Sequence, residues 1–234
     1  MKIRRMNLKQ TGAGLMEVLI AMSISLVVTA SMIALMANSL GSTTRIIQMT
    51  KLSDDMRVAL QMMSRDLRRA SYNANSMYCY ANTDCADDGI VTVAGDITLA
   101  DIDSDSVNDC LTFLTDRDYD GDSTEDSAGG FRRVTTGDGV GIIEMWTGDA
   151  AADCMDDAGA AGWVQITDPS QMNISGFSID DSLSYVQDIL DDGTNKVSMR
   201  IRKVRMLLEG ELVLDSSITR EMQDIISVRN DLLL

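Results

Sequence analysis

The chain has 234 residues, 45% of them apolar, which is enough for a folded domain with a buried core. Its 36 acidic and 20 basic residues give a formal net charge of -16, which argues against a protein that neutralises nucleic-acid phosphates over its surface. The sequence has no histidine, so a serine or cysteine nucleophile would lack its usual base and a zinc site its commonest ligand. We therefore expect neither an enzyme nor a nucleic-acid-binding protein.

The N-terminal region separates into a basic segment and an apolar segment. Residues 1–12 contain four basic residues and no acid, and residues 15–37 contain no Gly, no Pro and a single charge, Glu17. As a helix the apolar segment is about 35 Å long, enough to cross a bilayer. The positive-inside rule predicts a cytoplasmic N-terminus and an exported remainder. A cleaved secretory signal is the alternative, but its apolar core would be shorter.

Glu17 is an unusual residue for a membrane-spanning helix, because a carboxylate in hydrocarbon costs about 2–3 kcal/mol or more. The sequence that leads to it, GAGLME, resembles the signal of prepilins, in which a peptidase cleaves after Gly and a Glu is the fifth residue of the mature chain. The resemblance implies cleavage between Gly12 and Ala13, N-methylation of Ala13, and pairing of Glu17 with the N-terminal ammonium of a neighbouring subunit. Ala13 occupies the position where prepilins usually have Phe.

Residues 42–71 have the apolar spacing of an amphipathic helix, with charged residues on the opposite face. Because the one Pro is Pro169, this stretch and the apolar segment can form a single helix of about 60 residues, with Gly41 as a flexing point. We expect the apolar stripe to pack on the chain's own domain, and a surface for a partner helix is the alternative reading. The stripe consists of Ile46, Met49, Leu52, Met56, Leu60, Met63, Leu67 and Ala70.

After Tyr72 the sequence changes to short Val-, Ile- and Thr-rich runs between Gly and Asp clusters, which predicts strands and turns. We therefore expect an α+β fold in which an antiparallel sheet packs on the helix. The expected segments are a cytoplasmic leader (1–12), a transmembrane helix (13–40), its amphipathic continuation (41–72) and a β-rich domain (73–234). The expected strands are residues 90–93, 110–114, 131–134, 142–146, 163–166, 174–179, 197–207 and 218–229.

Two acidic runs follow the helix, within a region (84–192) of 26 acidic residues and three arginines. In the first run carboxylates alternate, and Gly121 stands where an EF-hand calcium loop needs its sharp turn. Ser127 replaces the closing Glu of such a loop, so a solvated acidic turn without an ion is the alternative. The candidate calcium ligands are Asp116, Asp118, Asp120, Asp122, Glu125 and Asp126. The second run, which lacks the Gly, is interpreted as acidic surface and consists of Asp101, Asp103, Asp105 and Asp109.

The four cysteines all follow the apolar segment, and their even number suits two disulfides in an oxidising compartment. Three connectivities are possible. We favour Cys79–Cys85, which would close a short turn after the helix, together with Cys110–Cys154, which would tie a strand to a loop. No CxxC motif is present, which disfavours redox catalysis.

The similarity to pilins extends beyond the signal. Residues 56–73 (MRVALQMMSRDLRRASYN) look like the helix end of PilW-type minor pilins and of the J-type pseudopilins of type II secretion. Residues 110–121 (CLTFLTDRDYDG), 163–169 (WVQITDP) and 227–232 (SVRNDL) also look like PilW-type sequences. The resemblance implies the type IV pilin fold, in which a long N-terminal helix packs on an antiparallel sheet, and processing by prepilin peptidase.

The resemblance further implies a minor pilin of a type IV pilus that primes filament assembly or lies near the pilus tip. Its partners would be other minor pilins, the major pilin, prepilin peptidase and the inner-membrane assembly platform. The chain would begin as a single-pass inner-membrane protein with a periplasmic C-terminal domain and then reach the pilus. A J-type pseudopilin is the alternative. An anchored ectodomain that binds calcium, the one cofactor we consider, is a second alternative if the leader stays uncut.

Overall fold

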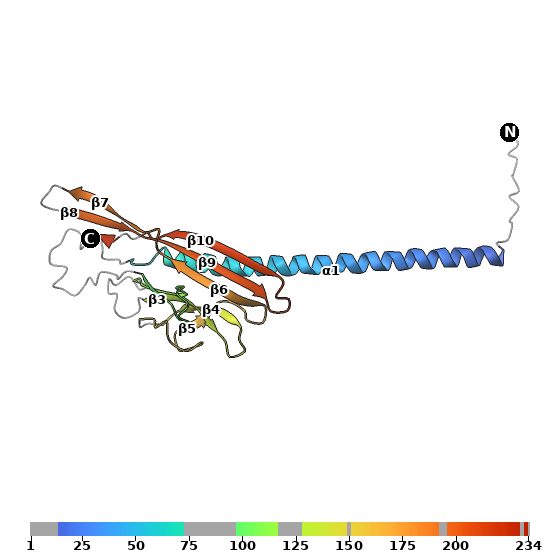
Figure 1. Ribbon diagram of the computed structural model, residues 1–234, viewed down its shortest axis with the longest axis horizontal. Helices are drawn as coiled ribbons and strands as arrows, with labels where there is room; N and C mark the ends of the chain where they lie inside the picture. Colours follow the sequence, from blue (N-terminus) through green and yellow to red (C-terminus); the bar gives the residue numbers. More distant parts are fainter. Residues whose placement is uncertain are drawn as a thin grey trace, which may run out of the picture. The chain divides into compact units, whose positions relative to one another are not determined.

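A computed structural model describes residues 14–72, 97–116, 128–148, 151–191, 196–229 and 232–233 of the chain. In this part of the chain one long helix, α1 (Leu15–Leu67), precedes a series of antiparallel strands (Figure 1). The chain divides into two compact units, Met1–Gln48 and Met49–Leu234. The combination of a long apolar N-terminal helix and antiparallel sheets confirms the predicted α+β class.

The first unit contains the N-terminal part of α1, which runs through Gly41 without interruption. Six of its hydroxyl side chains, those of Ser23, Thr29, Ser31, Ser42, Thr43 and Thr44, donate hydrogen bonds to backbone carbonyls three or four residues earlier. Ser23 donates to the carbonyl of Leu19 at 2.9 Å, and Thr29 donates to that of Ser25 at 2.7 Å. Such bonds satisfy polar groups within the helix itself, so the helix surface needs no external hydrogen-bond partner at these positions.

In the second unit, one face of α1 is buried in the main hydrophobic core. The buried positions recur every three or four residues, as expected for one face of a helix, and six of the eight stripe residues are among the buried ones. Met49 packs at the margin of the core, whereas Ile46 is exposed. The predicted packing of the stripe on the chain's own domain is therefore correct from Leu52 onward.

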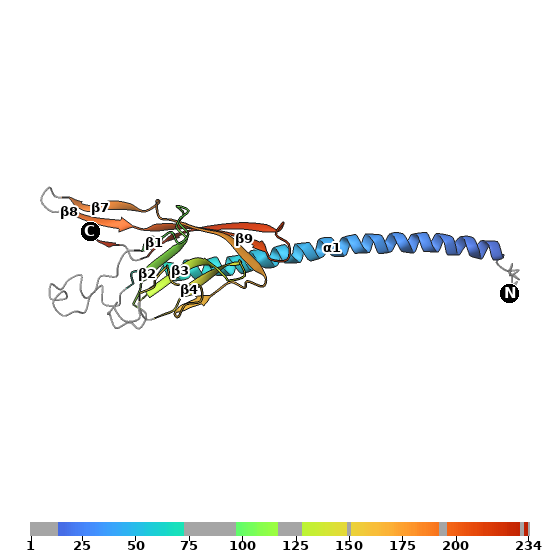
Figure 2. The same cartoon turned by 60° about the horizontal axis from the view of Figure 1, so that its bottom comes forward.

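The strands form three antiparallel sheets, whose arrangement can be followed in Figures 1 and 2. The five-stranded sheet is a meander of β1 (Thr98–Ala100), β2 (Cys110–Leu114), β3 (Ala128–Thr135), β4 (Gly141–Trp146) and β5 (Trp163–Gln165). A three-stranded sheet has the order β10 (Thr219–Ser227), β9 (Lys203–Leu212), β6 (Met172–Asp180). The third has the order β11 (Leu232–Leu233), β8 (Lys196–Ile201), β7 (Tyr185–Asp191).

Strand β9 supplies much of the sheet side of the core. Its buried residues alternate with less buried ones, and Val204, Met206 and Leu208 belong to the same apolar cluster as the buried face of α1. Gly210 lies where a Cβ atom would be 3.2 Å from the sulfur of Met56 on α1. The absence of a side chain at this position therefore lets the helix approach the strand closely.

The helix ends four residues earlier than the predicted boundary at Ser71. After Leu67, the N–H groups of Arg69 and Ala70 donate to carbonyls three residues earlier, which tightens the last turn. Ser71 then has a positive φ of 58°, a conformation that cannot continue an α-helix.

The strand predictions are correct for β2, whose bounds match, and approximately correct for β3, β4, β5, β6 and β10. The single strand predicted at 197–207 is wrong, because the chain forms β8 and β9 with a break at Arg202. The Arg202 side chain is buried and donates to Ser71, and its carbonyl accepts from the N–H of Val228. The strands β1, β7 and β11 were not expected, and the strand predicted at 90–93 lies outside the described residues.

Replacement of Met63 by Ala tests the packing of α1. Met63 is fully buried, so Met63→Ala should lower the free energy of unfolding by about 2–5 kcal/mol through lost burial and a residual cavity. Val58→Ala on the exposed side of the same helix is the matched control and should change it by about 0.5 kcal/mol or less. Denaturant unfolding of the full chain in detergent measures both, and equal losses would contradict the assigned helix face.

Candidate functional site

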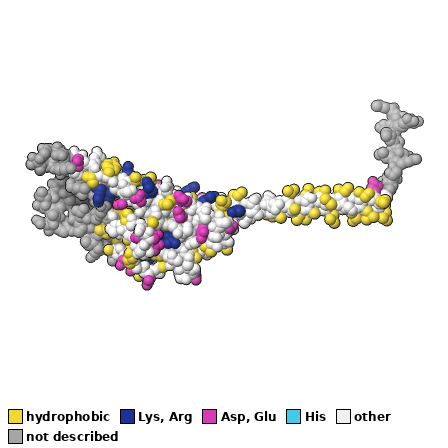
Figure 3. All heavy atoms as spheres, viewed as in Figure 1, with side chains coloured by type: hydrophobic (Ala, Val, Ile, Leu, Met, Phe, Trp, Pro, Cys, Tyr) yellow, Lys and Arg dark blue, Asp and Glu magenta, His cyan; other side chains and the backbone are white. Residues whose placement is uncertain are grey.

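From Leu15 to Met36 the side chains of α1 are mostly apolar and exposed, and they are visible as the hydrophobic atoms along the helix in Figure 3. Leu15 is 81% exposed and Leu35 71%, and no residue of the most apolar stretch is buried. Of the described residues, α1 is the one helix that is long and apolar enough to cross a membrane, judged by length and composition. A surface of this kind needs lipid or other apolar helices around it.

Glu17 lies in the first turn of α1 with its side chain exposed. Its N–H donates to the carbonyl of Gly14 at 2.9 Å, which starts the helix. A carboxylate here interacts favourably with the helix dipole. Among the described residues no ion pair involves Glu17, so its charge is available to a partner from outside the chain. Gly12 and Ala13, the predicted processing site, lie outside the described residues.

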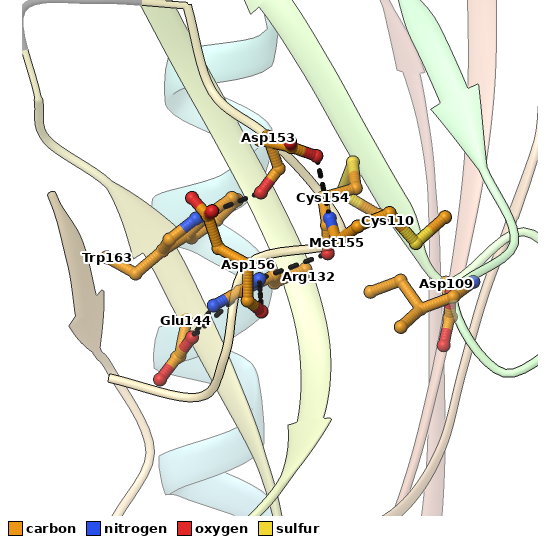
Figure 4. The surroundings of a disulfide bond; sticks show 10 residues. Asp109, Cys110, Arg132, Glu144, Asp153, Cys154, Met155, Asp156 and Trp163 are labelled. Atoms are coloured by element: carbon orange, nitrogen blue, oxygen red, sulfur yellow. Dashed lines mark hydrogen bonds and ion pairs between the residues drawn. A yellow bond between two sulfur atoms is a disulfide. The ribbon is translucent and has the colours of Figure 1, made fainter. Parts of the chain in front are cut away.

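A disulfide joins Cys110 in β2 to Cys154, with the two Cα atoms 6.0 Å apart (Figure 4). This is the pairing favoured from the sequence for these two cysteines. The bond closes a loop with a sequence separation of 44, which corresponds to about 4 kcal/mol of stabilisation in the chain-entropy account. The other predicted pair, Cys79 and Cys85, lies outside the described residues.

Beside the disulfide, Arg132 of β3 and Glu144 of β4 form an ion pair that is shielded from solvent. The two residues face each other in the register of β3 and β4, and the guanidinium Nη2 lies 2.8 Å from Glu144 Oε2. The Arg132 side chain is fully buried and that of Glu144 is 1% exposed. A buried charge of this kind is tolerated only when its hydrogen-bonding capacity is met.

The remaining donors and acceptors of this ion pair are met by a single irregular segment. Arg132 donates to the carbonyls of Cys154, Asp156 and Asp157, and Glu144 Oε1 accepts from the N–H of Gly159 at 2.7 Å. Figure 4 shows how the guanidinium reaches from the sheet into this segment. The segment, residues 153–162, has little regular secondary structure and is thus held by the disulfide and the ion pair together.

Two tryptophans cover the same cluster. The Trp163 ring lies 4.1 Å from the Arg132 guanidinium, and its N–H donates to the carbonyl of Asp153 at 3.2 Å. Trp146 packs edge-on against Trp163 with ring centroids 5.3 Å apart. Together with Cys110 and Cys154 they form a second, smaller apolar cluster, which excludes water from the ion pair.

Truncation of the buried arginine tests this arrangement. Arg132→Met leaves the Glu144 carboxylate buried without its cation, so it should lower the free energy of unfolding by about 3–5 kcal/mol. The double variant Arg132→Met/Glu144→Leu also removes the unpaired carboxylate. Its loss of unfolding free energy should therefore be smaller than the sum of the losses in the two single variants. Denaturant unfolding measures this coupling, and additive losses would contradict the assigned ion pair. Limited proteolysis should also show faster cleavage within residues 153–162 of Arg132→Met.

The second acidic run forms a tight loop between β1 and β2. The carboxylates of Asp101, Asp103 and Asp105 lie within 4.8 Å of one another, and the backbone N–H groups of Ser104 and Ser106 donate to Asp101. Asp103 and Asp105 are exposed, as expected for acidic surface. These N–H dipoles partly offset the repulsion among the three carboxylates.

The prediction that this acidic run lies on the surface is wrong for Asp109, which is only 5% exposed. Its N–H donates to Ala100 and its carbonyl accepts from Arg133, so its backbone belongs to the strand pairing that leads into β2. Burial raises the pKa of its carboxyl group, although the N–H of Ile102, which donates to it at 2.8 Å, acts in the opposite direction.

Of the first acidic run, which contains the candidate calcium ligands, Asp116 is the one ligand that lies within the described residues. Asp116 follows β2, its N–H donates to the carbonyl of Tyr72, and its side chain is fully buried. The other predicted calcium ligands, Asp118, Asp120, Asp122, Glu125 and Asp126, lie outside the described residues. Calcium binding therefore remains a prediction from the sequence.

The cluster around Arg132 is not among the features predicted from the sequence. In sequence terms Arg132 is one of three bases in an acidic region, and Glu144 is one of its acids. A signal was present at Glu144, which interrupts the otherwise apolar strand-like run GIIEMW, where a charge is expensive unless it is paired. The pairing itself depends on the register of β3 against β4.

Comparison with known proteins gives one family match. The family model described as prepilin peptidase-dependent protein B matches residues 45–228, which comprise most of the chain. No match was found among curated proteins or among solved structures.

Proposed function

Because this chain belongs to the family of prepilin peptidase-dependent protein B, we propose that it is a minor pilin of a type IV pilus. The family match begins at residue 45, after the apolar part of α1, so the processing site is argued from the sequence of the N-terminus itself. We infer that prepilin peptidase cleaves between Gly12 and Ala13 and that the new N-terminus at Ala13 is methylated. Cleavage removes a leader with four basic residues and no acid.

The observation that carries this proposal is the exposed apolar surface of α1 with a lone carboxylate in its first turn. A lone carboxylate is expensive in lipid, and so is an N-terminal ammonium. When Glu17 meets the ammonium of a neighbouring Ala13, each charge supplies the partner that the other lacks. Apolar packing between helices would then proceed without a buried unpaired charge, as a filament core requires.

The same chemistry fits two related roles. In the first, the subunit primes assembly or lies near the pilus tip, together with other minor pilins and the major pilin, after passage from the inner membrane. In the second, it is a J-type pseudopilin of a type II secretion system. An anchored calcium-binding ectodomain would require an uncut leader.

Intact mass and N-terminal sequence, measured on sheared surface filaments and on membranes, separate these roles. A methylated Ala13 terminus in the sheared fraction supports a minor pilin. The same terminus confined to membranes favours a pseudopilin, and a chain that still begins at Met1 in both fractions would refute the proposal.

Gly12 is the residue on which cleavage should depend. Gly12→Leu places a bulky side chain at the cleaved bond and should leave the leader of twelve residues attached. Gly14→Ala, two residues beyond the bond, is the matched control and should be processed normally, since a Cβ atom at this position meets no other atom within 4 Å. Mass spectrometry of the membrane fraction measures both, and a mature-length chain from Gly12→Leu would contradict the cleavage site.

Glu17 should affect assembly without affecting processing. Glu17→Val removes the carboxylate, so the chain should be cleaved but should fall at least about tenfold in sheared filaments, which corresponds to the loss of about 1.4 kcal/mol. Met16→Val, which alters an exposed apolar neighbour, is the control and should be incorporated normally. Immunoblots of sheared filaments against membranes provide the measurement. Normal incorporation of Glu17→Val would exclude the pairing role.

A further inference from the structure

A pocket of about 320 Å³ lies where α1 ends beside β10, and it is unusually rich in arginine for a protein with a net charge of -16. Three of the arginines come from the helix end and the turn that follows it, and the fourth follows β10. One acidic residue, Asp224, also lines the pocket. The lining residues are Gln61, Ser64, Arg65, Arg68, Arg69, Asp224 and Arg229.

The frame of this basic pocket is fixed by contacts between distant parts of the sequence. The hydroxyl of Ser64 on α1 donates to Asp224 of β10. The N–H of Arg229 donates to the carbonyl of Arg68 at 3.2 Å. Helix end and strand end are thus held together, so the arginine side chains project from an ordered base rather than from a loose loop.

The arginines are not needed to cap the helix. A cation near a helix C-terminus often stabilises the last carbonyls. Here the carbonyls of Ser64, Asp66, Leu67, Arg68 and Arg69 already accept hydrogen bonds from other donors. The donors are the N–H groups of Arg68, Arg69, Ala70, Tyr72 and Arg229 and the hydroxyl of Thr115.

The nearby carboxylates are also already engaged. Asp224 accepts from Ser64, and Asp66 contacts its neighbour Arg65 at 3.4 Å. Among the described residues no ion pair involves Arg68 or Arg229, and both are exposed. By contrast, Arg132 is paired with Glu144, and Arg205 with Asp180. Four arginines and one acid, Asp224, line the pocket. Because Arg65 contacts Asp66 and Arg69 is engaged in another interaction, Arg68 and Arg229 are the two of these arginines without an ion pair among the described residues.

We propose that this basic pocket, defined by Arg65, Arg68, Arg69 and Arg229, docks a pair of carboxylates on a neighbouring pilin subunit. Guanidinium groups bind carboxylates in a fixed, often bidentate geometry, and two carboxylates match the two guanidinium groups, those of Arg68 and Arg229, that have no ion pair among the described residues. The net charge of -16, with acidic side chains scattered over the face that Figure 3 shows, disfavours a long polyanion, which would be repelled beyond the pocket. The identity of the partner rests on the proposed pilin function.

Photo-crosslinking in cells that produce the full chain tests this docking. Benzoylphenylalanine at Gln61, which is exposed and lines the pocket, should form a light-dependent adduct with another pilin subunit. The crosslinked peptide should contain at least two acidic residues within one helical turn or one loop. An adduct with lipid or nucleic acid, a peptide without acidic residues, or no adduct would overturn the proposal.

Charge reversal separates docking from mere proximity. Arg68→Glu/Arg229→Glu should lower the adduct yield about tenfold. Arg57→Glu, an exposed arginine of α1 outside the pocket, should change it less than twofold. Replacement of the two partner carboxylates by Lys should restore the adduct with the reversed pocket. An unchanged yield in the double variant would overturn the proposal.

Two further measurements separate loss of docking from misfolding and from failure of the proposed pilin function. The Cys110–Cys154 disulfide and the protease resistance of the double variant report whether it folds. If it does not fold, Arg68→Gln/Arg229→Gln replaces it and should lower the yield severalfold, while an unchanged yield overturns the proposal. The mass of the same chains reports leader removal. An uncut leader with a charge-dependent adduct refutes the pilin function alone, whereas a cut leader with a charge-independent adduct refutes the docking alone.

Discussion

The packing of one face of α1 on β6 and β9 is the interaction on which the rest of the second unit depends. Apolar residues of the helix from Leu52 to Leu67 share a single core with the alternating buried residues of the two strands. No other helix occurs among the described residues, so α1 supplies the helical side of this core. At Gly210 a Cβ atom would lie 3.2 Å from the sulfur of Met56, so the strand lies close to the helix side chains at this position.

Outside this core, the irregular segment 153–162 is attached to the five-stranded sheet by polar and covalent contacts. The segment 153–162 has few large apolar side chains and little regular structure, so burial alone holds it weakly. It is held instead by one covalent bond and by one buried cation that donates hydrogen bonds to three of its carbonyls. Arg132 thus acts as an internal anchor for a loop, a role in which its five donors matter as much as its charge.

How far the sequence predicts the fold depends on whether a feature is local. The spacing of apolar residues predicts the buried face of α1, and the apolar run at 110–114 predicts β2 to the residue. The break at Arg202 could not be predicted, because it arises from a buried side chain bonded to Ser71, 131 residues away. The ion pair of Arg132 depends equally on a cross-strand register, and Asp109 is buried by strand pairing on both sides.

The hydrogen bonds of Ser23, Thr29 and Ser31 within α1 affect how easily the helix could move from lipid into a bundle of other helices. Each hydroxyl is satisfied by a carbonyl of its own helix, so none has to exchange partners when the material around the helix changes. Transfer of α1 from lipid to a bundle of helices would therefore replace one apolar contact by another along its length. The free-energy difference between the two surroundings would then be concentrated at the two ends of this segment, where the charged groups lie.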